Sequence, residues 1–399
     1  MNKFIAALAL MCSTLLTTNS ALAQAQQPSL EEMWQLIQLQ QEQIQTLQQQ
    51  LGQQEEQIEE TNMIAVTAID AAESFADSGN SNKWYDRVGL GGYTEHHYNM
   101  VQEGSDTIDA HRYVLFFSNE FSDDLRFFSE FELEHGLAGE GKPGEVELEQ
   151  AFIEWQFSQN HRLTMGQYLL PVGILNETHE PNTFYGVERN LVESEVVPST
   201  WWETGLMFSG EIAPGLSYDA AMHSGLQVDN FRIRSGRQKS ALATADNLAY
   251  TGRLRYTGIP GLDLSASVQY QDDITQSTLA DEASATLTQA HLIYQKGDFS
   301  LRALYASWNI DNVEFEANGS DQPSGWFVEP SYKLTDKLGL FARYSEVDPS
   351  RGDRPAELTE RVDYGFNYWL HPQVAIKLDY QDSLEAGSDA INMGIGWSF

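Results

Sequence analysis

From residue 84 to the last residue, apolar and polar side chains alternate with a period of two in a series of segments about ten residues long. In the final segment Ile391, Met393, Ile395, Trp397 and Phe399 share one parity, and small or polar residues occupy the other. Successive side chains of a β-strand point to opposite faces, so each segment has one apolar and one polar face. Strands of a transmembrane β-barrel require this arrangement, with the apolar face toward lipid and the polar face toward the lumen.

Sixteen segments follow this pattern, and the connections between them alternate in length. The expected strands are 86–101, 110–120, 125–137, 144–156, 162–173, 201–211, 215–226, 248–257, 261–271, 285–295, 299–309, 325–334, 338–347, 358–369, 374–381 and 389–399. The seven short connections are 122–124, 159–161, 213–214, 258–260, 296–298, 335–337 and 371–373. The eight longer connections between them are 102–109, 138–143, 174–200, 227–247, 272–284, 310–324, 348–357 and 382–388. Antiparallel barrels show this alternation because tight turns lie at one rim and longer loops at the other.

The sequence therefore predicts an all-β membrane protein, a 16-stranded antiparallel transmembrane β-barrel over residues 84–399. Barrels of 14 or 18 strands are the alternatives, since each differs by a single hairpin. A β-sandwich would also alternate in and out, but it would not sort its connections by length so regularly. The closing residues Gly396, Trp397, Ser398 and Phe399 resemble the C-terminal signal that barrel-assembly machinery recognises in outer-membrane proteins.

The first 23 residues are typical of a secretory signal peptide. Lys3 supplies the positive charge, residues 4–16 form a short apolar run, and residues 21–23 form a small-residue cleavage site. Cys12 is the single cysteine, so the mature chain would contain no disulfide. No later stretch approaches the roughly 20 apolar residues that a membrane-spanning helix needs. We expect a Gram-negative outer-membrane location, with short turns, both chain ends and the N-terminal segment in the periplasm.

Residues 24–75 are rich in Gln and Glu and follow a seven-residue period. One column of the repeat holds Leu30, Ile37, Ile44, Leu51, Ile58 and Ala65. Such a column favours an N-terminal α-helical coiled coil, although a companion column of mixed polarity makes that coil weak on its own. A single solvated helix and a disordered Gln-rich segment are the alternatives. Residues 76–83 are predicted to be a linker.

Net charge excludes one class of partner. The chain carries 58 acidic and 23 basic side chains, and a net charge of −35 repels nucleic acid. No residue pattern combines a nucleophile with a base, so the sequence gives no indication of an enzyme, a cofactor or a metal site. A barrel of about 16 strands is too wide for its own side chains to fill, which favours a water-filled pore.

The longest connection, residues 174–200, is the candidate for narrowing this pore, because unusually long loops are often functional. Its candidate constriction residues are Glu177, His179, Glu180, Glu188, Arg189, Glu193 and Glu195. Folded inward, the loop would place a cluster of carboxylates where the dielectric is low and each charge has a larger effect. Folded outward, the same carboxylates would bind divalent ions together with lipopolysaccharide.

Five basic residues are predicted to face the lumen from the wall of the barrel. They are Arg253, Arg255, Arg343, Arg361 and Lys377. If an acidic loop faced this wall, a transverse field would order water and disfavour apolar solutes. The alternative is a stabilising charge ladder between neighbouring strands, running from Arg343 through Asp363 and Lys377 to Asp379.

Two sets of glutamates lie at period-two spacing on the third and fourth strands. They are Glu130, Glu132 and Glu134, and Glu145, Glu147 and Glu149. They would attract cations at the mouth of the pore, or lie on solvated strand extensions above the membrane. The alternation slips after these glutamates on the fourth strand, which predicts a β-bulge near Glu149 and Gln150.

Over residues 84–399 the chain resembles the family of phosphate-selective porins O and P. The likeness is densest in residues 166–173, Gly-Gln-Tyr-Leu-Leu-Pro-Val-Gly, and continues through 188–190 to 198–203, Pro-Ser-Thr-Trp-Trp-Glu. The resemblance implies a 16-stranded trimeric barrel, a signal peptide, often a coiled-coil helix, and a loop corresponding to 174–200 that folds into the lumen.

The charge departs from that family, whose members attract anions through lumen arginine ladders and lysines at the mouth. From Ser74 onward this chain has 49 acidic and 22 basic residues, and no three successive inward positions are basic. We therefore expect a general or mildly cation-preferring porin for small hydrophilic solutes or ions. A phosphate- or anion-selective porin is the first alternative. The second is a structural barrel, anchored in outer-membrane lipid, that tethers the coiled coil to the periplasm or to peptidoglycan.

Overall fold

The computed structural model describes residues 84–349, 358–384 and 389–399, together with Trp34, Gln38 and Gln41. The predicted signal peptide, linker and, apart from those three helical residues, the coiled-coil segment lie outside the described residues. Within the described part of the chain, no helix is long and apolar enough to cross a bilayer.

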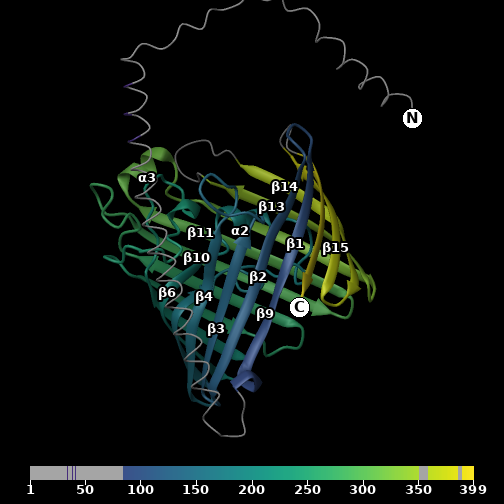
Figure 1. Ribbon diagram of the computed structural model, residues 1–399, viewed down its shortest axis with the longest axis horizontal. Coiled ribbons are helices and arrows are strands. Elements are labelled where there is room, and N and C mark those ends of the chain that lie inside the picture. Colours follow the sequence, from purple (N-terminus) through teal and green to yellow (C-terminus); the bar gives the residue numbers. More distant parts are fainter. Residues whose placement is uncertain (1–33, 35–37, 39–40, 42–83, 350–357, 385–388) are drawn as a thin grey trace, which may run out of the picture. The chain divides into compact units, whose positions relative to one another are not determined.

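The described residues from Tyr85 onward form one closed barrel of sixteen strands in chain order (Figure 1). The strands are β1 (Val88–Val101), β2 (Thr107–Ser122), β3 (Leu125–Glu134), β4 (Val146–Ser158), β5 (His161–Leu169), β6 (Trp202–Ala213), β7 (Leu216–His223), β8 (Ala249–Tyr256), β9 (Leu262–Gln271), β10 (Ser284–Lys296), β11 (Phe299–Asp311), β12 (Ser324–Thr335), β13 (Leu338–Asp348), β14 (Thr359–His371), β15 (Val374–Ser383) and β16 (Ala390–Ser398). Every neighbouring pair is antiparallel, and β1 pairs with β16 to close the barrel.

The predicted strand number is therefore confirmed, and 14 or 18 strands are excluded. The largest errors are at strand ends. The predicted fifth strand extended to 173, whereas β5 ends at Leu169, because the chain then leaves the wall and the carbonyl of Pro171 accepts from the Ser267 hydroxyl of β9. The predicted third strand extended to 137, whereas β3 ends at Glu134, and His135 and Gly136 adopt positive φ angles that no strand continues.

Burial separates the two faces of the wall. On β9 the outward Val268 is 48% exposed, whereas the inward Gln269 is fully buried. The predicted bulge in β4 is confirmed, because Glu130 pairs with Gln150 while the next residue, Phe131, pairs with Leu148. The extra residue is Glu149, and it reverses the parity of the strand: Glu147 and Glu149 are buried, whereas Trp155 and Phe157 beyond the bulge are exposed.

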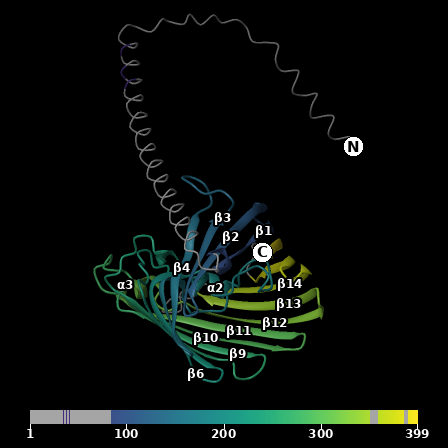
Figure 2. The ribbon, with the colours of Figure 1, turned by 60° about the horizontal axis from the view of Figure 1, so that its bottom comes forward.

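In the described residues from 84 onward, four short helical segments supplement the strands. They are η1 (Trp84–Arg87), α2 (Leu191–Glu195) between β5 and β6, η2 (Arg234–Gly236) between β7 and β8, and α3 (Val313–Asn318) between β11 and β12. Figure 2 shows α2 within the ring of strands, where it packs against β12 and β13. These helices were not predicted, since each is too short to show a helical period.

Candidate channel lumen

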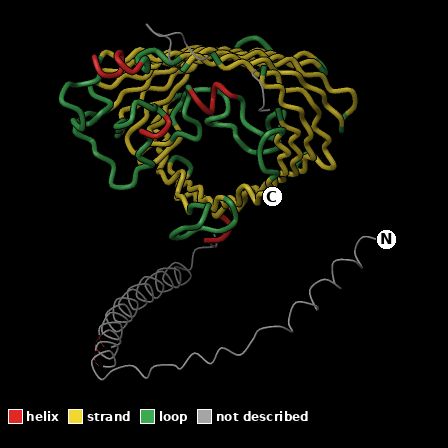
Figure 3. Tube along the Cα trace, turned by 90° about the horizontal axis from the view of Figure 1, so that it is seen from above, coloured by secondary structure: helices red, strands yellow, loops and turns green. Residues whose placement is uncertain are grey.

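The chain between β5 and β6, residues 170–201, is here called the lumen loop. It contacts inward-facing side chains from many strands of the barrel. Arg112 of β2 donates to the backbone carbonyl of His179 at 2.9 Å, and Asp379 of β15 accepts from the N–H of Val187 at 2.7 Å. Further wall side chains donate to loop carbonyls: Ser267 to Pro171, Trp308 to Val196, Arg302 to Thr183, Asn367 to Phe184 and Arg361 to Arg189. In Figure 3, loop segments and a short helix lie within the ring of strands.

An apolar cluster attaches the lumen loop to the inner face of β10 and β11. Trp201 of the loop and Trp308 of β11 are buried with ring centroids 6.2 Å apart. Leu170, Val172, Val196, Leu287 and Leu304 belong to the same cluster. Full burial of a Val or Leu side chain stabilises by about 1.5–3 kcal/mol. The inner wall is therefore apolar at this point because it packs against the loop rather than water.

Glu193 ties the two ends of the lumen loop together. Its Oε1 accepts from the backbone N–H groups of Ile174 at 2.5 Å and Leu175 at 2.7 Å. Its Oε2 accepts from the side chain of Asn190, the N-cap of α2, whose own Oδ1 accepts from the N–H of Glu193. Burial raises the pKa of Glu193, and these hydrogen bonds oppose that rise. Glu193 is thus a structural residue rather than a group that faces a solute.

His179 lies between two buried carboxylates of the wall. Its Nε2 is 3.5 Å from Oε1 of Glu130 and 3.4 Å from Oε2 of Glu149. Burial lowers the pKa of His179, but the hydrogen bonds and charges of the two glutamates outweigh burial and raise the pKa to about 10. The imidazole is therefore cationic at neutral pH and neutralises part of this acidic wall.

Three of the remaining predicted loop residues, Glu177, Glu188 and Arg189, have separate partners and do not gather into the expected cluster. Glu177 pairs with Arg253 of β8. Glu188 accepts from Asn99 at 2.8 Å and is 3.0 Å from His97 Nδ1. Burial raises the pKa of Glu188, but the hydrogen bonds from His97 and Asn99 and the charge of His97 together outweigh burial and lower the pKa to about 2. Arg189 donates to the Thr200 hydroxyl, Glu180 is half-buried, and Glu195 is exposed.

The predicted basic wall is largely paired with carboxylates of the same or neighbouring strands. Arg343 donates to Glu329 at 3.0 Å and to Asp363, which also accepts from Arg361. On the other side of the barrel, Arg253 donates to Asp219 at 2.7 Å, and Arg255 forms an ion pair with Asp263. The Arg343–Asp363 pair is the one step of the predicted charge ladder that is seen among the described residues. Lys377 differs, because its Nζ lies 3.6 Å from the ring centroid of Phe184 in the lumen loop.

The two glutamate sets are not solvated extensions, with one exception. Glu130, Glu132 and Glu149 are 1–2% exposed, whereas the Glu145 side chain is 61% exposed. The inward-facing members are covered by His179 of the lumen loop and by Lys239, which donates to both Glu145 and Glu147. Glu134 is half-buried. The spacing in the sequence predicted that each set of glutamates shares a face, but it did not predict the loops that cover that face.

Lys239 belongs to a second group of basic residues that sequence reasoning missed, in the loop 224–248. Arg234 donates to the carbonyls of Ser194 and Ser199, and Arg237 donates to the carbonyl of Thr200. Among the residues that the structure describes, no carboxylate lies within ion-pair distance of Arg189, Arg234 or Arg237. Burial and the neighbouring guanidiniums of Arg234 and Arg189 lower the pKa of Arg237 to about 10. No period marks this loop, so only its four basic residues within eight positions could have indicated it.

The wall also contains a buried pair that period-two parity could have revealed. Arg112 Nε lies 2.5 Å from Oε1 of Glu95, and both side chains are almost fully buried. Toward the short-turn rim, a polar cavity of about 410 Å³ is lined by charged residues that include Arg162, Asp219, Arg253 and Arg255. Charged groups therefore line the lumen on both sides of the loop.

Three comparisons place the chain among known proteins. An uncharacterised protein of Aquifex aeolicus strain VF5 is 28% identical over 350 residues, which cover 78% of this chain and 80% of that protein. The structure of Salmonella typhi OmpF in complex with daunomycin superposes with a TM-score of 0.56 at 17% identity, over 78% of this chain and 97% of that one. The in-vitro folded trimer form of Vibrio cholerae OmpT gives 0.51 at 14% identity, over 78% and 98%.

The two solved structures share the fold with this chain. The family model described as phosphate-selective porin O and P matches residues 88–388, which is nearly the whole barrel. Family and fold together point to an outer-membrane channel rather than an enzyme. This chain belongs to the family of the phosphate-selective porins O and P.

Proposed function

We propose that the protein is a porin through which small hydrophilic solutes or ions diffuse passively, with a mild preference for cations. The lumen loop forms the narrowest part of its channel. The observation that carries this proposal is the set of hydrogen bonds that tie the loop to inward-facing side chains of β2, β9, β11, β14 and β15. A loop held in this way narrows the lumen but does not close it, as a separate plug domain would.

The preference for cations follows from how the basic wall is paired. Arg253, Arg343 and Arg361 each donate to carboxylates, so their charge is neutralised before a solute arrives. To bind one of these arginines, an anion would have to displace a carboxylate that the guanidinium already holds in a bidentate pair or by two hydrogen bonds. The excess of acids over bases from Ser74 onward adds a negative field at both mouths.

The decisive measurement is the zero-current potential of the purified protein in a planar bilayer under a KCl gradient, followed by titration with phosphate. We expect a cation-preferring potential and no block by phosphate. An anion-preferring potential with phosphate block would contradict the proposal. Absence of conductance from folded barrels would instead favour the structural anchor.

A second candidate, an anion-selective porin, is favoured by one specific observation. Arg189, Arg234 and Arg237 donate to carbonyl or hydroxyl oxygens of Thr200 and Ser194 in the lumen loop, and the charges of Arg189 and Arg234 lower the pKa of Arg237. Three guanidiniums without carboxylate partners attract anions, and their mutual repulsion would be relieved by one.

The two candidates are separated by charge removal in this arginine group. If the channel selects anions there, the double change Arg234→Gln and Arg237→Gln abolishes phosphate block and moves the zero-current potential toward cations. Arg232→Gln is the matched control, because Arg232 is exposed on the same loop. An unchanged potential in the double variant would remove the anion-selective candidate.

We further propose that the barrel forms a homotrimer with the N-terminal segment in the periplasm as an accessory coiled coil. Trimers are known for the fold neighbour Vibrio cholerae OmpT. Deletion of residues 24–83 from the mature chain tests the accessory role. We expect trimers and conductance to persist, whereas loss of trimers alone would assign assembly to the coiled coil.

A further inference from the structure

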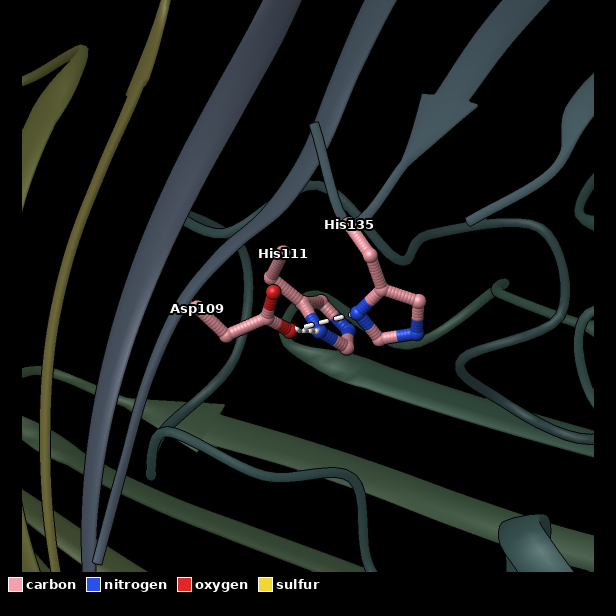
Figure 4. Close-up of side chains that lie close together, drawn as sticks. All are labelled: Asp109, His111 and His135. Carbon is pink, nitrogen blue, oxygen red and sulfur yellow. Dashed lines mark hydrogen bonds and ion pairs between the residues drawn. The ribbon is translucent and has the colours of Figure 1, made fainter. Parts of the chain in front are cut away.

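Three side chains at the long-loop rim of the barrel converge on one point (Figure 4). Asp109 and His111 lie on β2, where its pairing with β1 shifts register so that Asp109 pairs with His97, and His135 follows the end of β3. Oδ2 of Asp109 lies 3.1 Å from Nδ1 of His111 and 2.7 Å from Nδ1 of His135. The backbone supports this arrangement, because the N–H of His135 donates to the carbonyl of His111 at 2.9 Å.

From this geometry we propose that Asp109, His111 and His135 bind a divalent transition-metal ion of the zinc class. Two imidazole nitrogens aimed at the same carboxylate oxygen present three ligand atoms within 4.8 Å of one another. In a tetrahedral site with bonds of about 2.0–2.2 Å, ligand atoms are about 3.3–3.6 Å apart. To admit the ion, Asp109 Oδ2 would need to move about 0.2–0.5 Å farther from Nδ1 of His111 and about 0.6–0.9 Å farther from Nδ1 of His135.

The chemistry of the ligands selects the kind of metal. Imidazole nitrogens favour Zn²⁺, Ni²⁺, Co²⁺ and Cu²⁺, whereas Ca²⁺ and Mg²⁺ require sets of oxygen ligands. The side chains of Asp109, His111 and His135 are 25%, 30% and 36% exposed, so an ion and a completing water can reach the site.

His97 orients the site without being a ligand. Its ring stacks on His111 with centroids 4.3 Å apart. Both of its nitrogens are already engaged, Nε2 with Glu95 at 3.2 Å and Nδ1 with Glu188 at 3.0 Å. Glu188 belongs to the lumen loop, so the rings of His111 and His97 connect the proposed ion to that loop.

Two other groups of acidic and histidine side chains have comparable spacing but contain a cation of the chain itself. His179 is the cation between Glu130 and Glu149, and Lys239 is the cation between Glu145 and Glu147. Neither group needs a metal ion to balance its charge. The Asp109 group instead brings one carboxylate together with two imidazoles.

The test is equilibrium dialysis of the purified full-length protein in detergent against Zn²⁺, with Co²⁺ as a spectroscopic probe. We expect one saturable site per chain and Co²⁺ absorption typical of a tetrahedral site. His111→Asn and His135→Asn should each weaken binding by at least about tenfold. Asparagine at 135 also tolerates the positive φ of 50° at that position.

His96→Asn is the matched control, since His96 lies next to His97 on the outward face, where it stacks on Trp397. Heat-dependent migration on gels verifies that each variant has a folded barrel, and Asp109→Asn provides a third variant if one histidine variant does not fold. Absence of saturable binding, or equal binding by His135→Asn and His96→Asn, would overturn the proposal. Binding that is lost only when His179 is replaced would also overturn it.

Discussion

Oε1 of Glu193 lies 2.5 Å from the backbone nitrogen of Ile174, nineteen positions earlier in the chain. This one carboxylate joins the beginning of the lumen loop to the helix α2 near its end. Because its two ends are connected in this way, the loop is expected to pack against the wall as one unit.

Replacement of Glu193 by Ala should therefore release the lumen loop while leaving the barrel intact. Hydrogen bonds to a charged group contribute about 1.5–3 kcal/mol each, and the loss leaves the two N–H groups without a partner. We expect faster proteolysis within residues 170–201 and noisier, larger single-channel conductance. Glu195→Ala, on the exposed side of the same helix, is the control. Equal conductance noise in the two variants would show that Glu193 does not fix the loop.

A single methyl group at Gly173 should disturb the same contact. Gly173 has a φ of +76°, and a Cβ there would lie 2.4 Å from Oε1 of Glu193. Gly297 has a φ of +59° with open space around it, so Gly297→Ala measures the cost of the left-handed backbone alone, about 1–2 kcal/mol. We expect Gly173→Ala to lower thermal stability more than Gly297→Ala does. A comparable loss in both variants would mean that backbone conformation, not the Glu193 contact, dominates at Gly173.

Because of His179, the lumen loop should lose stability at alkaline pH. Its folded-state pKa of about 10 is above the ordinary value of 6.5, so its contribution is complete below about pH 6.5 and is lost as the pH rises through 10. Loss of its charge leaves Glu130, Glu132 and Glu149 together without their cation from the loop. Loop proteolysis followed from pH 7 to above pH 10 should show release at the alkaline end.

In the companion variant His179→Asn, the lumen loop should already be released, and cleaved by protease, at neutral pH. Removing one partner of a buried ion pair costs about 3–5 kcal/mol, because the other charges remain buried. His371→Asn, at an exposed turn on the opposite rim, is the control. A proteolysis profile of His179→Asn that still changes at alkaline pH would assign the transition to another group.

The two arginines of β8 should differ sharply when each is replaced by Gln. Arg253 is buried between Asp219 and Glu177, so its loss should cost about 3–5 kcal/mol and make the channel more cation-preferring. Arg255 is 44% exposed in its pair with Asp263, and such pairs contribute about 0–1 kcal/mol. Thermal unfolding and zero-current potentials of both variants check this. If Arg255→Gln shifts the potential as much as Arg253→Gln does, pairing is not what governs selectivity.

The alternation of side chains determined the architecture by itself. In β16 and β9 the period of two separates lipid-facing from lumen-facing residues, and that separation is a property of each strand alone. Connection lengths then determined antiparallel order, and the slip in alternation on β4 located the bulge at Glu149. These features are local, so no knowledge of distant neighbours was needed.

Only the tertiary structure decided which charges are free. The spacing of Glu130 and Glu132 gave their shared face, but their burial depends on His179, which lies nearly fifty residues later in the chain. The pairing of Arg253 with Glu177 and the mutual repulsion of Arg189, Arg234 and Arg237 likewise depend on where the loops lie. The effective strength of a charge is set by its burial and its partners, and a loop without a period carries no sequence signal for either.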